Sequence, residues 1–188
     1  MEIKKRYFES WNYIVESRKY IYFIISIFFI AGVFGFIFHS NLDFLISTLK
    51  QMVERTKGLS LFELFVWIFV NNLRAALFGM LGGLVLGILP ILNALSNGVI
   101  LGYVFQMVGV KAGYLEFWKI LPHGIFELPA VFISLGIGVR LGMFVFTKNK
   151  KEVFVYETRQ AILTFILIVV PLLVLAAIIE SLLIWLKI

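Results

Sequence analysis

The sequence predicts an all-α, polytopic membrane protein, in which about five transmembrane helices form one bundle over residues 1–188. Three observations predict this fold class. Hydrophobic residues make up 61% of the chain, against roughly 45–50% in an ordinary soluble domain. Charged residues make up 15%, and the mean hydropathy is +0.99. A soluble domain of this size cannot bury so much apolar surface, so the lipid bilayer is the expected solvent and the first expected partner.

Five apolar stretches approach the roughly 20 helical residues that a bilayer core about 30 Å thick requires. The expected spans are residues 19–38, 64–89, 91–110, 122–146 and 161–186. The pair Asn97-Gly98 inside the third span leaves a short or broken helix as an alternative. Residues 39–60 are expected to form an external loop with amphipathic helical character. Residues 114–121 are expected to form an interfacial helix, since Trp118 and Lys119 suit the headgroup region.

The net charge of +6 is explained by membrane topology and not by nucleic-acid binding, because the basic residues flank the apolar stretches and form no separate basic face. Nine Lys and Arg residues lie in the N-terminal segment and in the loop between the fourth and fifth spans, and six lie on the opposite side. Because cytoplasmic loops carry the excess of basic residues, we expect a cell-membrane protein with a cytoplasmic N-terminus.

The composition also removes several classes of enzyme. The chain has no cysteine, which excludes disulfides, thiolate catalysis and cysteine-ligated metals. Its two histidines, His39 and His123, form no His-Glu-x-x-His pair, and no nucleophile elbow, Walker loop or dinucleotide fingerprint is present. We therefore expect a protein that is not an enzyme, with no catalytic residue, no metal and no cofactor.

A shift of 55 residues aligns the second span with the fourth and indicates an internal repeat. The small residues Gly79, Gly83 and Gly87 then fall on Ser134, Gly138 and Gly142, with a spacing of four that places each set on one helix face. Such glycine stripes let helix backbones approach closely in lipid. Chance similarity between apolar helices is the alternative. A real repeat is parallel, because both spans cross the membrane in the same direction.

Polar residues inside the spans are the candidate functional residues, because burying such groups in lipid is costly. The candidate cluster contains Asn71, Asn72, Arg74, Asn97, His123, Glu127 and Glu180, and Asn93 and Gln106 also fall within a span. Arg74 is expected to pair with Glu127, with Glu180 as the competing partner, since an unpaired Arg near the midplane is strongly disfavoured. Arg140 is expected to snorkel to the headgroups and has no further predicted role.

The segment Leu-Pro-His-Gly-Ile-Phe-Glu-Leu-Pro-Ala at 121–130 is the strongest local signal. His123 and Glu127 are four residues apart and share a helix face, and Pro129 leaves the carbonyl of Ile125 without its usual donor. One interpretation is a kinked helix with an internally satisfied polar pair. A second is a cation or proton site, and a third is a metallohydrolase site.

These residues resemble the stage II sporulation protein M family. The resemblance rests on the decapeptide at 121–130, on Asn71-Asn72 with Ala75, on Asn97-Gly98 with Gly102, and on the glycines of the second and fourth spans. Members of this family are multi-pass membrane proteins without an established enzymatic activity, and the resemblance implies the same for this chain. Its namesake works with peptidoglycan-degrading partners during engulfment of the forespore, and relatives occur in organisms that make no spores. The resemblance implies a scaffold or transport-like module with Asn72, His123 and Glu127 as signature polar residues.

Two functional hypotheses remain open at the level of the sequence. The first is a non-enzymatic membrane protein that assembles through its glycine-rich helices into a homo-oligomer and organises other membrane proteins. The second is a small transporter or channel, in which the polar cluster in the outer half of the membrane handles an ion or a proton. The parallel repeat and the proline inside the fourth span favour the second hypothesis, and the family resemblance favours the first.

Overall fold

The computed structural model describes residues 2–42, 44–114 and 121–186, and every regular element within these ranges is a helix. Five helical segments are long and apolar enough to cross a membrane, which confirms the predicted fold class. They are α1 (Glu2–Ile37), α3 (Leu61–Leu81) with the short helix Gly82–Leu84, α4 (Ile88–Ala112), α5 (Leu121–Gly142) with Met143–Phe146, and the run formed by α6 (Lys150–Thr164), the π-helical segment Phe165–Val169 and α7 (Val170–Leu186).

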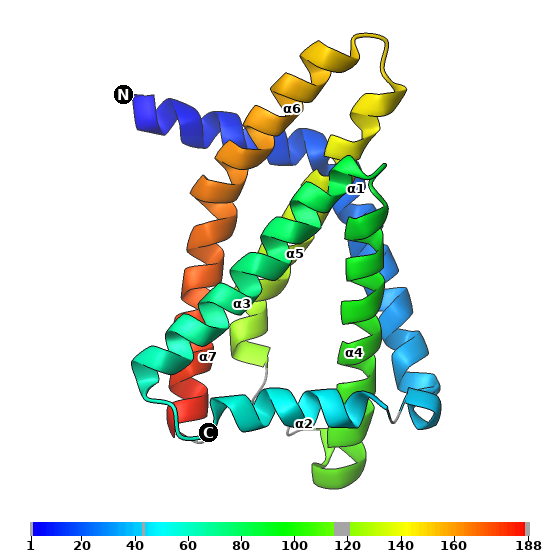
Figure 1. The fold of residues 1–188 in the computed structure, drawn as a ribbon, viewed down its shortest axis with the longest axis vertical. Helices are drawn as coiled ribbons and strands as arrows, with labels where there is room; N and C mark the ends of the chain where they lie inside the picture. Colours follow the sequence, from blue (N-terminus) through cyan, green and yellow to red (C-terminus); the bar gives the residue numbers. More distant parts are fainter. Residues whose placement is uncertain (1, 43, 115–120, 187–188) are drawn as a thin grey trace.

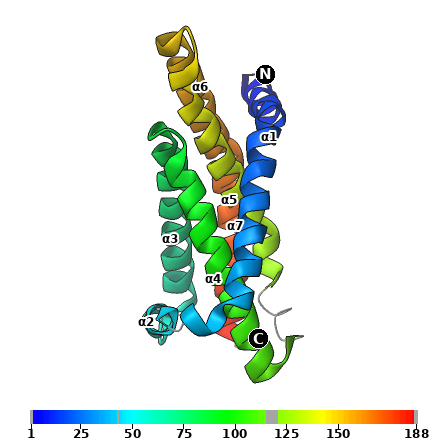
Figure 2. The ribbon, with the colours of Figure 1, turned by 90° about the vertical axis from the view of Figure 1, so that its right-hand side faces the viewer.

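The five spans form a bundle with two distinct ends. The start of α1, the α3–α4 turn and the α5–α6 turn lie together at the N-terminal end of the bundle, and the C-terminus lies at the opposite end (Figure 1). There α2 (Leu45–Thr56) lies across the bundle axis, as a second view confirms (Figure 2). We call this opposite end the α2 end. Residues 115–120 lie outside the described residues, so most of the interfacial helix predicted over 114–121 does as well.

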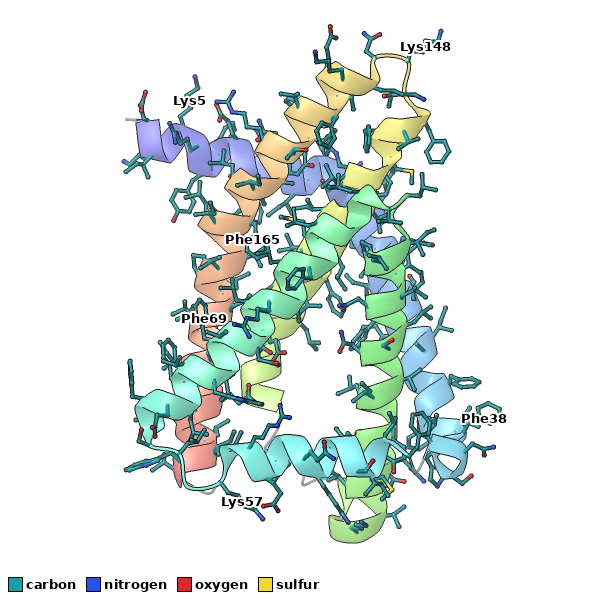
Figure 3. All side chains as sticks on the ribbon, viewed as in Figure 1. Lys5, Phe38, Lys57, Phe69, Lys148 and Phe165 are labelled. Atoms are coloured by element: carbon teal, nitrogen blue, oxygen red, sulfur yellow. The ribbon has the colours of Figure 1, made fainter. Side chains whose placement is uncertain are left out.

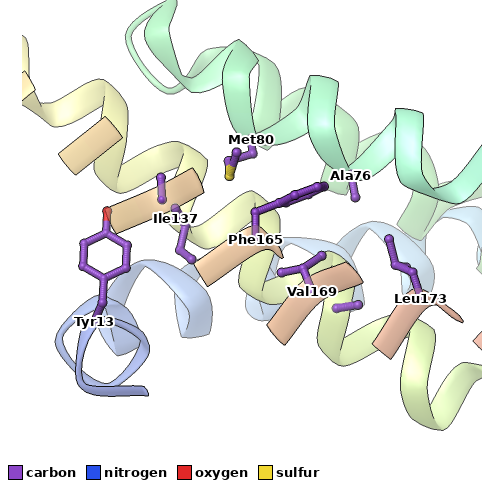
Figure 4. Close-up of a cluster of buried hydrophobic side chains, with 9 residues drawn as sticks. Tyr13, Ala76, Met80, Ile137, Phe165, Val169 and Leu173 are labelled. Carbon is purple, nitrogen blue, oxygen red and sulfur yellow. The ribbon is translucent and has the colours of Figure 1, made fainter. Parts of the chain in front are cut away.

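Two buried clusters hold the bundle together, and α5 contributes to both. One joins α5 to α1, α3 and the α6–α7 run, and includes Tyr13, Met80, Ile137 and Phe165 (Figure 4). The other joins α5 to α1 and α4 through residues such as Phe28 and Phe132. Because α5 packs against every other span, most of its side chains from Ala130 to Leu141 are buried inside the protein, whereas Ile125 and Pro129 are exposed.

The helix α1 begins well before the predicted span 19–38. Its first turns, residues 2–19, run across the N-terminal end of the bundle before the helix descends beside α4 (Figure 1). We call residues 2–19 the N-terminal arm. At the junction the hydroxyl of Ser17 donates to the carbonyl of Tyr13 at 2.7 Å, an i to i−4 bond that bends helices. Ser10, Tyr13 and Ser17 are buried, so one face of the arm packs on the bundle.

The remaining spans show how glycine and proline act in this fold. Helix α4 runs unbroken through Asn97-Gly98, so the alternative of a broken third span is wrong. The chain turns between α3 and α4 at Gly87, whose φ of +72° is a left-handed conformation that favours glycine. In the last span, Pro171 lacks the N–H that would bond the carbonyl of Leu167, and the π-helical segment Phe165–Val169 lies just before it.

The two glycine stripes pack against each other within one chain. A Cβ atom at Gly83 would overlap the carbonyl of Gly138, and one at Gly142 would overlap the backbone of Gly83 and Gly87. Ser134 donates a hydrogen bond to the carbonyl of Ala76 at 2.8 Å. The α3–α5 contact is therefore a backbone-to-backbone contact of the kind that small residues allow in lipid. Since these stripes are used inside the chain, a homo-oligomer would have to form through other faces.

Candidate functional site

A partly open cavity lies between α3, α4 and α5, with Phe28 of α1 on its wall and the exposed residues Asn71 and Asn97 at its edge. Its volume is about 310 Å³, and its polar lining consists of Asn71, Asn72, Asn93, Asn97 and Glu127. The remaining wall is apolar, and includes Ala76, Leu101 and Val131. The cavity thus collects one carboxylate and four carboxamides at membrane depth, where polar groups are expensive and mark functional sites.

Helical spacing explains why these residues meet. Asn93 and Asn97 are one turn apart on α4, and the Nδ2 of Asn97 donates to the Oδ1 of Asn93 at 2.7 Å. On α5, Glu127 lies three residues after Gly124, which also lines the cavity and whose missing side chain leaves space there. Asn71 and Asn72 enter from α3. Each of the three helices therefore presents one polar patch at the same level of the bundle.

Glu127 has no direct partner among the residues that the structure describes, where no ion pair or hydrogen bond to it is found. Its side chain is partly buried and faces the cavity. A second carboxylate, that of Glu180 on α7, is close enough to interact with Glu127 electrostatically. Two acids therefore lie near each other in the bundle, and asparagine side chains line the same cavity as Glu127.

Arg74 does not join this site. It is exposed and lines a separate cavity with Glu63 and Trp67 on the outer face of α3. The predicted pair of Arg74 with Glu127 is absent from the described structure, and so is a pair with Glu180. The reason is geometric, because two residues advance a helix by about 200°, so that Arg74 points away from the cavity that Asn72 lines.

The structure thus brings together Asn71, Asn72, Asn97 and Glu127 of the predicted cluster, places Glu180 beside them, and excludes Arg74. Asn93, a polar residue of the third predicted span that was not part of the cluster, joins the cavity wall. The backbone of His123 belongs to α5, but its side chain lies outside the described part of the chain, and so does its predicted role.

A second polar site, which the sequence did not predict, is centred on Arg140 at the N-terminal end of the bundle. Its Nε contacts Oε2 of Glu157 at 2.9 Å and its Nη2 contacts Oε1 of the same carboxylate at 3.0 Å, a bidentate pair. Glu16 binds Nη2 at 3.1 Å, and Ser17 accepts from Nη1 at 3.1 Å. The hydroxyl of Tyr13 donates to Glu157 at 2.6 Å, and its ring lies 4.3 Å from the guanidinium.

This network corrects the prediction that Arg140 snorkels to the headgroups. The side chain is only 14% exposed, and its partners come from the N-terminal arm and from α6. The partners lie outside the predicted spans, because Glu157 precedes residue 161 and Glu16 precedes residue 19. The spacing of Tyr13, Glu16 and Ser17 at three and four residues was the available signal, since it places all three on one helix face.

Fold and site together define a class of protein: a five-span helical membrane protein in which a carboxylate without an ion-pair partner among the described residues lies in a cavity lined by asparagines. Residues 24–183 match the family described as stage II sporulation protein M, and the chain belongs to this family. An uncharacterized protein of Methanocaldococcus jannaschii is 28% identical over 177 residues, covering 83% of this chain and 79% of the relative. A second uncharacterized protein of the same organism is 30% identical over 122 residues, covering 62% and 68%. No solved structure matches the chain.

Proposed function

We propose that the chain is a non-enzymatic membrane protein that moves a small monovalent cation across the membrane. The cation is a metal ion or a proton, and it binds in the cavity between α3, α4 and α5. The observation that carries this proposal is the Glu127 carboxylate, which lies inside the bundle without a counter-charge from any described residue. A carboxylate at that depth is stable when it is protonated or when it holds a cation. The asparagine oxygens supply further oxygen ligands of the type that alkali and other hard cations prefer.

The position of the cavity supports movement as well as binding. Towards the N-terminal end it stops where Ser134 bonds Ala76 and where Leu135 packs on Gly79. Its walls extend in the other direction to Gly124 and Val104, on the side of the α2 end. A cavity that extends towards one end and is bounded by tight packing at the other fits one state of an alternating-access carrier.

The distribution of basic residues indicates which end of the bundle faces the cytoplasm. Lys5 and Lys148 lie at the N-terminal end, and Lys57 lies at the α2 end (Figure 3). Because basic residues are denser at the N-terminal end, this end is cytoplasmic and the cavity communicates with the outside.

Thermal unfolding of the purified protein in detergent tests the binding step. A ligand that binds only the folded state stabilises it by RT ln(1 + [L]/Kd), about 2.7 kcal/mol at 100 times Kd. We expect the melting temperature to rise with NaCl or KCl but not with choline chloride, or to depend on pH alone if the ligand is a proton. Glu127→Gln should remove the dependence, whereas the control Glu63→Gln, on the exposed face of α3, should keep it. A dependence that survives Glu127→Gln contradicts the proposal.

A second candidate function is the organisation of partner proteins by a homo-oligomer, which family membership favours. The surface that fits a second copy is an apolar groove of about 380 Å³ between α1 and α4, lined by Phe29, Gly32, Val33, Phe36 and Phe105. Light scattering of the detergent-solubilised protein tests it. We expect a dimer mass that falls to the monomer mass in Val33→Glu, at an exposed groove residue outside the α1–α4 backbone contact, and a wild-type monomer contradicts it.

A further inference from the structure

The exposed face of the N-terminal arm carries an apolar stripe that the bundle does not cover. Phe8, Trp11 and Val15 are 66%, 60% and 44% exposed and follow one another at spacings of three and four, so they share one helix face. Ser10, Tyr13 and Ser17, which are buried on the bundle, occupy the opposite face. The arm is therefore amphipathic, but its polar face is the buried one and its aromatic residues lie on the exposed face.

Basic residues surround this stripe. The arm contains five basic residues, Lys4, Lys5, Arg6, Arg18 and Lys19, against three acidic residues, and one of these acids, Glu16, is paired with Arg140. Lys4 precedes Phe8 by four residues and Lys19 follows Val15 by four, so lysines flank the stripe on the same face. Lys148 and its neighbours in the α5–α6 turn lie at the same end of the bundle (Figure 3).

We propose that the N-terminal arm is an interfacial helix that binds the anionic phospholipid headgroups of the membrane that the protein spans. The arm is continuous with the membrane-crossing part of α1 and runs across the end of the bundle, so its free face meets the headgroup layer beside the protein (Figure 1). Tryptophan and phenylalanine bind at this depth, and lysine and arginine bind the phosphates of anionic lipids. The inference is independent of the function proposed for the cavity.

Fluorescence quenching of Trp11 tests the depth of the arm. In the full chain, Trp67→Phe, Trp118→Phe and Trp185→Phe together leave Trp11 as the only tryptophan, and the protein is placed in lipid nanodiscs. We expect phospholipids brominated near the headgroup end of the acyl chain to quench Trp11 at least twofold more than phospholipids brominated near the chain end. If neither brominated lipid quenches Trp11, the inference is overturned. Quenching of Trp11 by aqueous iodide would then show that it faces water, and protection from iodide would show that a second copy covers it.

The identity of the lipid is tested in the same discs. At equal mole fraction, shallow-brominated phosphatidylglycerol should quench Trp11 more than shallow-brominated phosphatidylcholine. The preference should disappear in Lys4→Gln, Lys5→Gln, Arg6→Gln and persist in the matched control Lys148→Gln, Lys150→Gln, Lys151→Gln, which removes the same charge at the same end. Equal quenching by both lipids in the wild type, or loss of the preference in the control alone, overturns the assignment to anionic lipid by the arm.

Discussion

At the scale of single residues, charge compensation separates the two polar sites. Arg140 lies between two carboxylates and beside the ring of Tyr13, so its burial is offset by a bidentate pair and by a cation–π contact. Glu127 shares its cavity with asparagines and interacts electrostatically with another acid, Glu180. The first site has its charges satisfied within the protein and holds α1, α5 and α6 together. In the second site, no described residue supplies a positive charge to Glu127, and a bound cation could supply it.

Removal of one partner from the Arg140 network should be strongly destabilising, because the other charge is left buried and unpaired. We expect Arg140→Met or Glu157→Gln to cost about 3–5 kcal/mol of unfolding free energy, and the double variant to cost less than the sum of the two. Chemical unfolding in detergent measures the cycle. Arg159→Met, an exposed position on the same helix as Glu157, is the control and should change stability by less than about 0.5 kcal/mol. Simple additivity of the two losses would contradict the pairing.

The residue scale also shows what a single sequence predicts well. It singled out Asn71, Asn72, Asn97 and Glu127 as polar residues inside apolar stretches, and the structure places all four on one cavity; their role stays a prediction. It could not place Arg74, since a pairing across helices depends on the rotation of α3 relative to α5, which periodicity alone does not fix. It missed the partners of Arg140, because they lie in helical turns outside the apolar stretches that predicted the spans.

Among the helices, backbones come into contact where glycines leave no side chain between them. Gly83 and Gly138, related by the 55-residue shift, are in backbone contact, and α1 and α4 meet in the same way where Gly102 contacts the carbonyl of Gly32. The sequence predicted stripes on the right helices, but it left open whether they pack within one chain or between two. The bends of the N-terminal arm and the π-helical segment were not predicted, because they follow from tertiary contacts and from one missing N–H group.

A methyl group at the α3–α5 contact should separate the two helices. We expect Gly83→Ala or Gly138→Ala to lower the melting temperature in detergent strongly, since the new Cβ atom meets backbone atoms that cannot move aside. Gly124→Ala is the matched control on α5, because among the described residues a Cβ atom there meets only Leu128, at 3.9 Å. It should be neutral or stabilising by up to about 1 kcal/mol, as for a glycine replaced within a helix. Equal decreases in melting temperature for Gly83→Ala and Gly124→Ala would show that the α3–α5 backbone contact is not the cause of the destabilisation.

At the scale of the whole molecule, the packing divides the bundle into a closed half and a half with a cavity. The closed half holds the glycine contact and the Arg140 network, and the other half holds the asparagines and Glu127. This arrangement predicts that water-soluble reagents reach the cavity from the α2 end only.

The absence of cysteine makes that prediction directly measurable. Ala75→Cys introduces a thiol into the cavity wall, and Lys148→Cys introduces one at the N-terminal end as a control. In sealed vesicles of known orientation, a membrane-impermeant maleimide should label the two positions from opposite sides. Labelling of both positions from the same side would contradict the one-sided access and the proposed orientation.

Ion flux in proteoliposomes tests most directly whether Glu127 carries a cation through the membrane, as we propose. The purified chain is reconstituted at known density, and uptake of Na⁺, K⁺ or H⁺ is followed under an imposed gradient. We predict uptake of one of these ions above that of protein-free vesicles, loss of the uptake in Glu127→Gln and its retention in Glu63→Gln. Wild-type uptake equal to that of empty vesicles for all three ions, or equal uptake by wild type and Glu127→Gln, would contradict cation transport through Glu127.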